Sequence, residues 1–162
     1  MALSIQAALI SAQSPQKSEP QFTLAISEWH GELGPRFDRV SLKLTNTSKE
    51  VFSEPGCSDM RGLYNISVSY NGVPLEEKNA AARRLAEQAV FCTHELGINP
   101  IKPGESIYRW FDLAYRYNLS RPGIYEVSIS RETDPEHPEK SVTVKSNTLT
   151  VVVPEPGANA PK

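Results

Sequence analysis

The amino-acid sequence predicts an all-β domain, an immunoglobulin-like antiparallel β-sandwich of about seven strands with one short inserted helix. Within Ile124–Ser130, Tyr125, Val127 and Ile129 alternate with Glu126, Ser128 and Ser130, which is the period of two that a half-buried strand requires. The 162 residues include 13 prolines and 9 glycines, which favour short segments joined by turns over a helical bundle. Several alternating segments separated by such turns are typical of two sheets packed face to face.

The first two strands are predicted over Gln21–Trp29 and Arg39–Thr45, where every second residue is apolar. The intervening segment His30–Pro35 contains two glycines and a proline and is expected to interrupt the pattern. A short apolar passage follows at Val51–Cys57 and includes a Pro55-Gly56 turn. The side chains predicted to point inward from the two strands are Phe22, Leu24, Ile26, Val40, Leu42 and Leu44.

A hairpin is predicted around Asn71-Gly72, after an alternating third strand at Tyr64–Tyr70. Both central positions of a type I′ turn need a positive φ, which Asn and Gly adopt more readily than other residues. The returning strand at Val73–Leu75 contains Pro74, which lacks a backbone N–H and therefore restricts this strand to the edge or the end of a sheet.

The segment Asn79–Phe91 has a different composition, because it lacks Gly and Pro and is rich in Ala, Arg, Glu and Gln. Asn79 suits the N-cap position, and apolar residues recur at helical spacing along one face. We therefore predict a helix of about three turns between the strands. The residues Gly97–Gly104 include Pro100 and Pro103 and are predicted to form a loop.

The remaining strands are predicted in the last third of the chain. Glu105–Leu113 alternates but carries aromatic residues on both faces, so we expect it to be covered on both sides. The strand at Ile124–Ser130 is followed by a polar hairpin loop at Arg131–Lys140. The last strand, Val142–Val153, is expected to contain a bulge at Ser146-Asn147.

The sandwich is predicted to span residues 21–153, between a leader and linker at 1–20 and a disordered tail at 154–162. The first 13 residues, MALSIQAALISAQ, resemble the end of a secretory signal peptide, although no Lys or Arg precedes Lys17; the alternative is a disordered tail. The signal-peptide interpretation implies a periplasmic or extracellular location. In such an oxidising compartment Cys57 and Cys92 can form one disulfide, and in a reducing one they are thiols.

Composition and motifs exclude several classes of function. Lys and Arg number 17 against 19 Asp and Glu and are scattered, so no basic patch for nucleic acid is expected. The sequence contains no run of 18 apolar residues and therefore no membrane span. His30, His94 and His137 lack the spacing of a zinc site, and no nucleotide or dinucleotide fingerprint occurs, so we expect no metal and no cofactor. Cys92 and His94 lie two residues apart, but the features that activate a catalytic thiol are missing, which predicts a protein that is not an enzyme.

Four segments carry a resemblance to known proteins: LTNTS (44–48), IKPGES (101–106), DLAYRYNLSRPGIYEVSISR (112–131) and VKSNTLTVVV (144–153). The pattern resembles uncharacterised secreted bacterial Ig-like β-sandwich proteins. More loosely, it is similar to the sandwich segment of deuterolysin-type metallopeptidases and to bacterial proteinase-inhibitor sandwich domains. The resemblance covers most of residues 21–153 and implies the fold, because the matching residues are turn and core positions. The His-Glu-x-x-His motif of the metallopeptidases is absent from this sequence, so the resemblance implies no peptidase activity.

The predicted binding residues are four aromatic side chains from one stretch of the chain: Tyr108, Trp110, Tyr115 and Tyr117. Exposed together, they would form a platform for a peptide or a sugar ring. The alternative is that aromatic residues at alternating strand positions fill the core or make cross-strand pairs.

The function predicted from these features is a non-catalytic, extracytoplasmic interaction or accessory module that binds a protein partner. One alternative is a proteinase inhibitor that acts through an exposed loop, either Asp134–Glu139 or the loop around Gly56. Another is a carbohydrate-binding module that uses Trp110 and the neighbouring tyrosines. An exposed row of aromatic rings would favour sugar binding, whereas a protruding loop held by a Cys57–Cys92 disulfide would favour inhibition.

Overall fold

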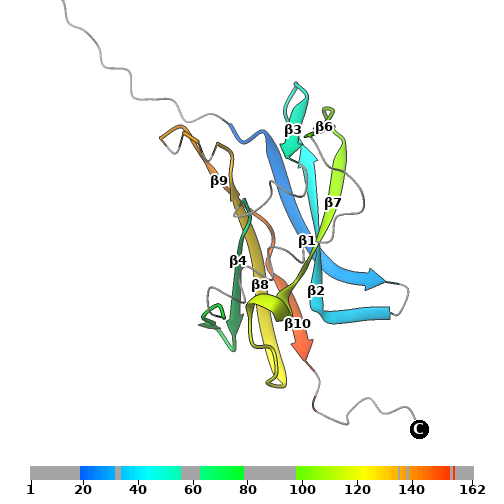
Figure 1. Cartoon of the computed structure of the whole chain (residues 1–162), viewed down its shortest axis with the longest axis vertical. Coiled ribbons are helices and arrows are strands. Elements are labelled where there is room, and N and C mark those ends of the chain that lie inside the picture. Colours follow the sequence, from blue (N-terminus) through cyan, green and yellow to red (C-terminus); the bar gives the residue numbers. More distant parts are fainter. Residues whose placement is uncertain are drawn as a thin grey trace, which may run out of the picture.

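The computed structural model describes residues 19–31, 34–55, 63–78, 98–134, 136–137, 139–153 and 155, which form two antiparallel sheets and a two-stranded ribbon (Figure 1). The strand order of the first sheet is β1 (Phe22–Gly31), β2 (Gly34–Asn46) and β7 (Ser106–Asp112). The strand order of the second sheet is β10 (Leu149–Val153), β8 (Gly123–Glu132), β4 (Asn65–Tyr70) and β5 (Val73–Pro74), and β9 (Thr143–Lys145) also pairs with β8. The ribbon consists of β3 (Phe52–Pro55) and β6 (Ile98–Ile101).

The connections between the sheets are those of an immunoglobulin-like domain. After β1 and β2 the chain crosses to the second sheet for β4 and β5, returns to the first for β7, and crosses again for β8, β9 and β10. Strands that pair therefore come from distant parts of the sequence, as in a Greek-key sandwich. The predicted all-β, Ig-like antiparallel sandwich is confirmed, but the described residues contain ten strands rather than about seven. The predicted helix at Asn79–Phe91 lies outside the described residues.

Apolar side chains from the facing surfaces of the two sheets form one core. The first sheet contributes Phe22, Leu24, Ile26, Val40, Leu42, Leu44 and Phe111, and the second contributes Ile66, Val68, Tyr125, Val127, Ile129, Val151 and Val153. All six inward residues predicted for the first two strands are buried. Burying one large aliphatic or aromatic side chain stabilises the folded state by about 1.5–3 kcal/mol. Alternation places such side chains on one face of each sheet, and packing the two faces together removes them from water.

Two of the segments that carry the family resemblance, LTNTS and IKPGES, meet at one end of the first sheet. The Asn46 amide donates hydrogen bonds to the carbonyl oxygens of Glu50 and Ile101, both at 2.7 Å. The backbone N–H of Asn46 donates to the carbonyl of Glu105, and its carbonyl accepts from Gly104. The Asn of LTNTS is therefore buried beside the turn of IKPGES, and its role is to join β2 to the segment between β6 and β7.

Tyr125, near the start of β8, anchors the connection that enters the second sheet. Its hydroxyl donates to the carbonyl oxygen of Arg121 at 2.8 Å, while its ring is buried. This arrangement is the tyrosine corner found in many immunoglobulin-like sandwiches. Burial raises the pKa of the Tyr125 hydroxyl above its usual value, since the ionised form would lose its solvation.

The predicted turn and bulge are both present. Asn71 and Gly72 have φ angles of 49° and 79°, as a type I′ hairpin requires. Between β9 and β10 the pairing with β8 shifts by one residue, which places the bulge at residues 146–148. There the side chain of Asn147 reaches the other sheet: its Oδ1 accepts from the N–H of Ile26 at 2.7 Å, and its Nδ2 donates to the Ile26 carbonyl at 3.0 Å.

Three predictions about local structure were wrong. The break at His30–Pro35 is shorter than predicted, because a register shift after Glu28 lets β1 and β2 continue to Gly31 and Gly34. The predicted loop Gly97–Gly104 contains β6, in which Pro100 is tolerated because both strands of a two-stranded ribbon are edges. The one-turn helix α2 (Leu113–Arg116), whose N-cap is Asp112, was not predicted.

We expect Tyr125→Phe to lower the free energy of unfolding by about 1 kcal/mol, because it removes the hydrogen bond to Arg121 and keeps the ring. Urea denaturation measures the difference. Tyr108→Phe is the matched control, since the Tyr108 side chain is largely exposed, and it should change stability little. Equal effects of the two substitutions would contradict a specific role for the tyrosine corner.

Candidate functional site

The outer face of the first sheet carries a cluster of aromatic and cationic side chains. Alternation along β2 and β7 turns Arg39, Lys43, Tyr108 and Trp110 away from the core, and Trp29 joins them from β1. We call these five residues the aromatic face. In the sheet register Lys43 is opposite Tyr108, and Arg39 is opposite Asp112.

Arg39 lies over two neighbouring tryptophan rings. Its guanidinium carbon is 5.2 Å from the ring centroid of Trp29 and 4.8 Å from that of Trp110, and the two indole centroids are 6.4 Å apart. The Arg39 Nε donates to Oδ2 of Asp112 at 3.1 Å, while Oδ1 of the same carboxylate accepts from the N–H of Ala114. The N-cap of α2 therefore also holds the Arg39 side chain, so the stack is fixed before any ligand arrives.

Tyr108 is the most exposed aromatic residue of this cluster. Its side chain lies beside the stack on the same strand as Trp110, and the residue is 63% exposed. The prediction that this strand is covered on both sides was therefore wrong at Tyr108. Opposite Trp110 the outward positions of β2 and β1 carry the short side chains of Ser41 and Ser27, whereas Lys43 lies opposite Tyr108.

The structure brings together only part of the predicted binding set. Tyr108 and Trp110 share the aromatic face, and Tyr115 is 44% exposed on α2. Tyr117 is only 2% exposed, and its hydroxyl donates to the carbonyl oxygen of Ile66 inside the sandwich. Tyr117 is therefore a structural residue and not part of an exposed platform. The sequence analysis missed Trp29 and Arg39, because only the sheet register brings them to Trp110.

A second charged cluster is completely buried. Arg131 on β8 forms an ion pair with Glu54 on β3, and the Tyr64 hydroxyl donates to Oε1 of Glu54 at 2.7 Å. The Arg131 guanidinium carbon also lies 5.0 Å from the ring centroid of Phe22 and 5.5 Å from that of Phe52. No ligand can reach these groups without opening the core, so their role is structural.

Two groups of this cluster, Tyr64 and Arg131, have raised pKa values. Burial, followed by the negative charge of Glu54, raises the pKa of Tyr64 far above its usual value, so the hydroxyl stays protonated and donates. Burial alone would lower the pKa of Arg131, but its electrostatic interactions and hydrogen bonds with Tyr64 and Glu54 outweigh this effect and raise that pKa. Arg131 therefore stays a cation inside the sandwich.

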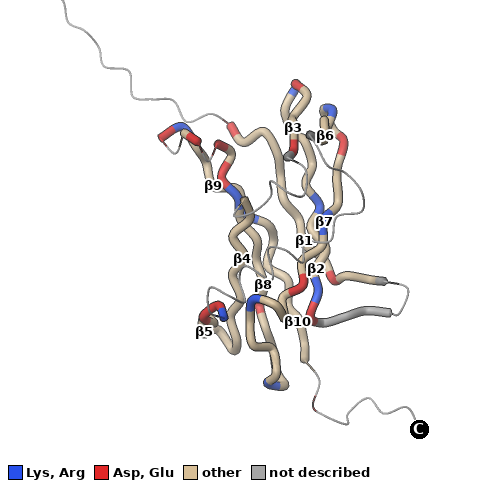
Figure 2. The backbone as a smooth tube through the Cα atoms, in the orientation of Figure 1, with Lys and Arg blue, Asp and Glu red and all other residues tan. Residues whose placement is uncertain are grey.

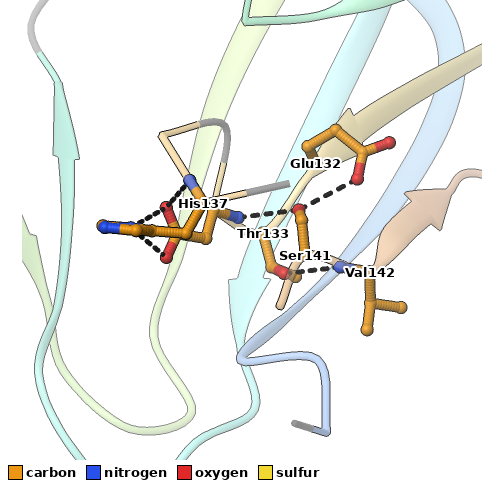
Figure 3. A network of polar contacts seen from close by, with 6 residues as sticks. Glu132, Thr133, His137, Ser141 and Val142 are labelled. Atoms are coloured by element: carbon orange, nitrogen blue, oxygen red, sulfur yellow. Dashed lines mark hydrogen bonds and ion pairs between the residues drawn. The ribbon is translucent and has the colours of Figure 1, made fainter. Parts of the chain in front are cut away.

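The hairpin between β8 and β9 contains the predicted inhibitor loop (Figure 3). At its base, Ser141 Oγ accepts from the N–H of Asp134 at 3.0 Å and donates to Glu132 at 2.9 Å. The ring Nδ1 of His137 lies 3.0 Å from the Asp134 carboxylate, and both side chains are exposed. The other candidate loop, around Gly56, and the proposed Cys57–Cys92 disulfide lie outside the described residues and stay predictions.

Neither a metal cluster nor a membrane-spanning helix is found among the residues that the structure describes. No group of three or more His, Cys, Asp or Glu side chains in this part of the chain is arranged to hold a metal ion. No helix within it is long and apolar enough to cross a bilayer. His30 and His137, two of the three histidines considered as ligands, are exposed in this part, and His94 lies outside it.

The fold and the site define a class: an immunoglobulin-like β-sandwich with an aromatic and cationic outer face. No protein-family model and no curated protein matches the sequence. Among solved structures, the chain is similar to the archaellum periplasmic stator protein complex FlaF and FlaG from Sulfolobus acidocaldarius. The TM-score is 0.38 and the sequence identity 14%, over 88% of this chain and 100% of that chain. A similarity this distant assigns no function.

We expect Arg131→Met to lower the free energy of unfolding by about 3–5 kcal/mol, because it leaves Glu54 in the core without its cationic partner and with only the Tyr64 hydroxyl donating to it. The double variant Glu54→Met with Arg131→Met removes both charges and should be more stable than the single variant. Urea denaturation of the three proteins compares them. A double variant less stable than Arg131→Met would show that packing, and not the unpaired charge, determines the loss.

The hairpin loop should respond to acid. Loss of solvent favours the neutral form of Asp134, but hydrogen bonds from the backbone and ring of His137, together with its charge, outweigh this and lower the Asp134 pKa. The interaction between Asp134 and His137 therefore stabilises the folded state at neutral pH, and this contribution is lost as the pH falls through the lowered Asp134 pKa. An NMR titration of the Asp134 carboxyl carbon measures that pKa. His137→Ala should raise it towards the usual value, and an unchanged pKa would contradict the interaction.

Proposed function

We propose that this domain is a non-catalytic binding module that acts in the periplasm or outside the cell and contacts a protein partner through the aromatic face. The observation that carries the proposal is the Trp29–Arg39–Trp110 stack beside the exposed ring of Tyr108. The extracytoplasmic location rests on the resemblance of the first 13 residues to a signal peptide.

Tyr, Trp and Arg are the residue types most enriched among the energetic hot spots of protein interfaces. In this chain Tyr108 and Trp110 lie in the regular pairing of β7 with β2, while Trp29 and Arg39 flank the register shift between β1 and β2. Asp112 holds Arg39 in place, so a partner would not have to order this side chain on binding. Because an ordered surface loses less conformational entropy, a pre-formed stack favours tight binding.

The same geometry favours a protein over a carbohydrate. A sugar ring stacks on the open face of an aromatic side chain. Arg39 lies over one face of each indole, and the two rings are tilted by 51°, so they do not form a flat platform. A proteinase-inhibitor function remains an alternative that rests on the loop between β8 and β9, where the hydrogen bonds of Ser141 tie the base of the hairpin.

Site-specific photocross-linking tests the proposal. Tyr108 is replaced by the photoreactive residue benzoylphenylalanine in the source cells, and Ser67, exposed on the outer face of the second sheet, is the control position. We expect a defined protein adduct from position 108 and none from position 67. Arg39→Ala should weaken the same complex by about tenfold, because a hot-spot truncation costs more than 1 kcal/mol. Equal labelling at both positions, or no protein adduct at 108, would contradict the proposal.

A further inference from the structure

The outermost strands of a sheet expose unpaired backbone N–H and C=O groups that can pair with another chain, and natural proteins usually protect them. Several edges of this sandwich are protected. β5 has only two residues and ends at Pro74. On β7, Arg109 is partly buried and directed towards the core, and an inward charge discourages the approach of another strand. Both strands of the β3–β6 ribbon contain a proline, Pro55 and Pro100.

The remaining side of the sandwich, where β1 faces β9 and β10, is protected only in part. The amide of Asn147 occupies both backbone groups of Ile26 and so blocks the middle of β1. β9 has three residues and carries the charge of Lys145. The other edge strand on this side of the sandwich is β10.

β10 shows none of these protective features. Its five residues, Leu149–Val153, contain no charge, Pro or Gly and three consecutive valines, and Figure 2 shows no charged residue on this strand. Among the described strands only β8 pairs with it. Val152 is 62% exposed and its partner Ile124 on β8 is 51% exposed, so an apolar pair lies on the outer surface next to this edge. A strand of this composition is a template for strand addition.

We propose that a second copy of this chain pairs with β10, its own β10 running antiparallel, so that the two second sheets become one continuous sheet. A two-fold antiparallel pairing places each strand opposite itself. A charged strand would then face like charges, whereas β10 is uncharged along its whole length. The exposed Val152 and Ile124 side chains of both copies would form one apolar strip across the junction, and its burial would add to the backbone hydrogen bonds between the strands.

Sedimentation velocity of the full chain over a range of concentrations tests this pairing. We expect a monomer–dimer equilibrium. Val152→Lys should raise its dissociation constant by about tenfold, because the two-fold axis brings the added charges together. Val73→Lys, at the opposite edge of the same sheet, is the matched control and should leave the equilibrium unchanged. Both positions are exposed, so the fold should tolerate both substitutions.

Hydrogen exchange gives a second readout that does not depend on a variant. In the wild-type chain, backbone amides of β10 should gain protection as the concentration rises, while those of β5 and β7 should not. A chain that stays monomeric at every concentration overturns the proposal. This holds whether the β10 edge then pairs with a strand of another protein or stays exposed to solvent. Dimers that Val152→Lys leaves intact also overturn it, since their interface would lie elsewhere.

Discussion

The ion pair between Arg131 and Glu54 is the interaction on which the arrangement of the sandwich depends. A buried guanidinium is tolerated only where a counter-charge and polar partners meet it, and here the partners come from β3 and from the residue before β4. The rings of Phe22, Phe52 and Tyr64 surround the cation and connect it to β1 and the ribbon. A shift of β8 by one residue would turn Arg131 outward and leave Glu54 unpaired, so the pair specifies the register of β8 against the rest of the fold.

The same period of two that builds the core also builds the aromatic face. On β7, Phe111 enters the core, while Tyr108 and Trp110 on the opposite side remain at the surface. Asp112 is the last residue of this strand and the N-cap of α2. The same carboxylate accepts a hydrogen bond from Arg39 and so fixes the position of the guanidinium over the two indole rings. On the exposed side of the first sheet, Arg39 is therefore held by a hydrogen bond to Asp112 and by contacts with two indole rings.

The aromatic face and the β10 edge belong to different sheets. Pairing of two copies through β10 would extend the second sheet and leave the outer face of each first sheet open. A dimer of this kind would carry two aromatic faces and would bind a repeated or clustered partner with higher avidity than a single domain, provided that the spacing allows both to engage. The two proposals depend on different residues and stand independently.

The sequence by itself determined the strands with strict alternation, the Asn71-Gly72 turn, the bulge near Asn147 and the all-β class, because these depend on local periodicity and turn chemistry. It did not determine β6, whose four residues include Pro100 and become a strand only because β3 lies beside them. Nor did it distinguish Tyr117 from Tyr108: both belong to one aromatic stretch, but the first is enclosed by the sandwich and the second is exposed on β7. The Trp29–Arg39–Trp110 stack and the Arg131–Glu54 pair join residues far apart in the chain, so only tertiary structure, through strand register and sheet packing, decided which side chains meet.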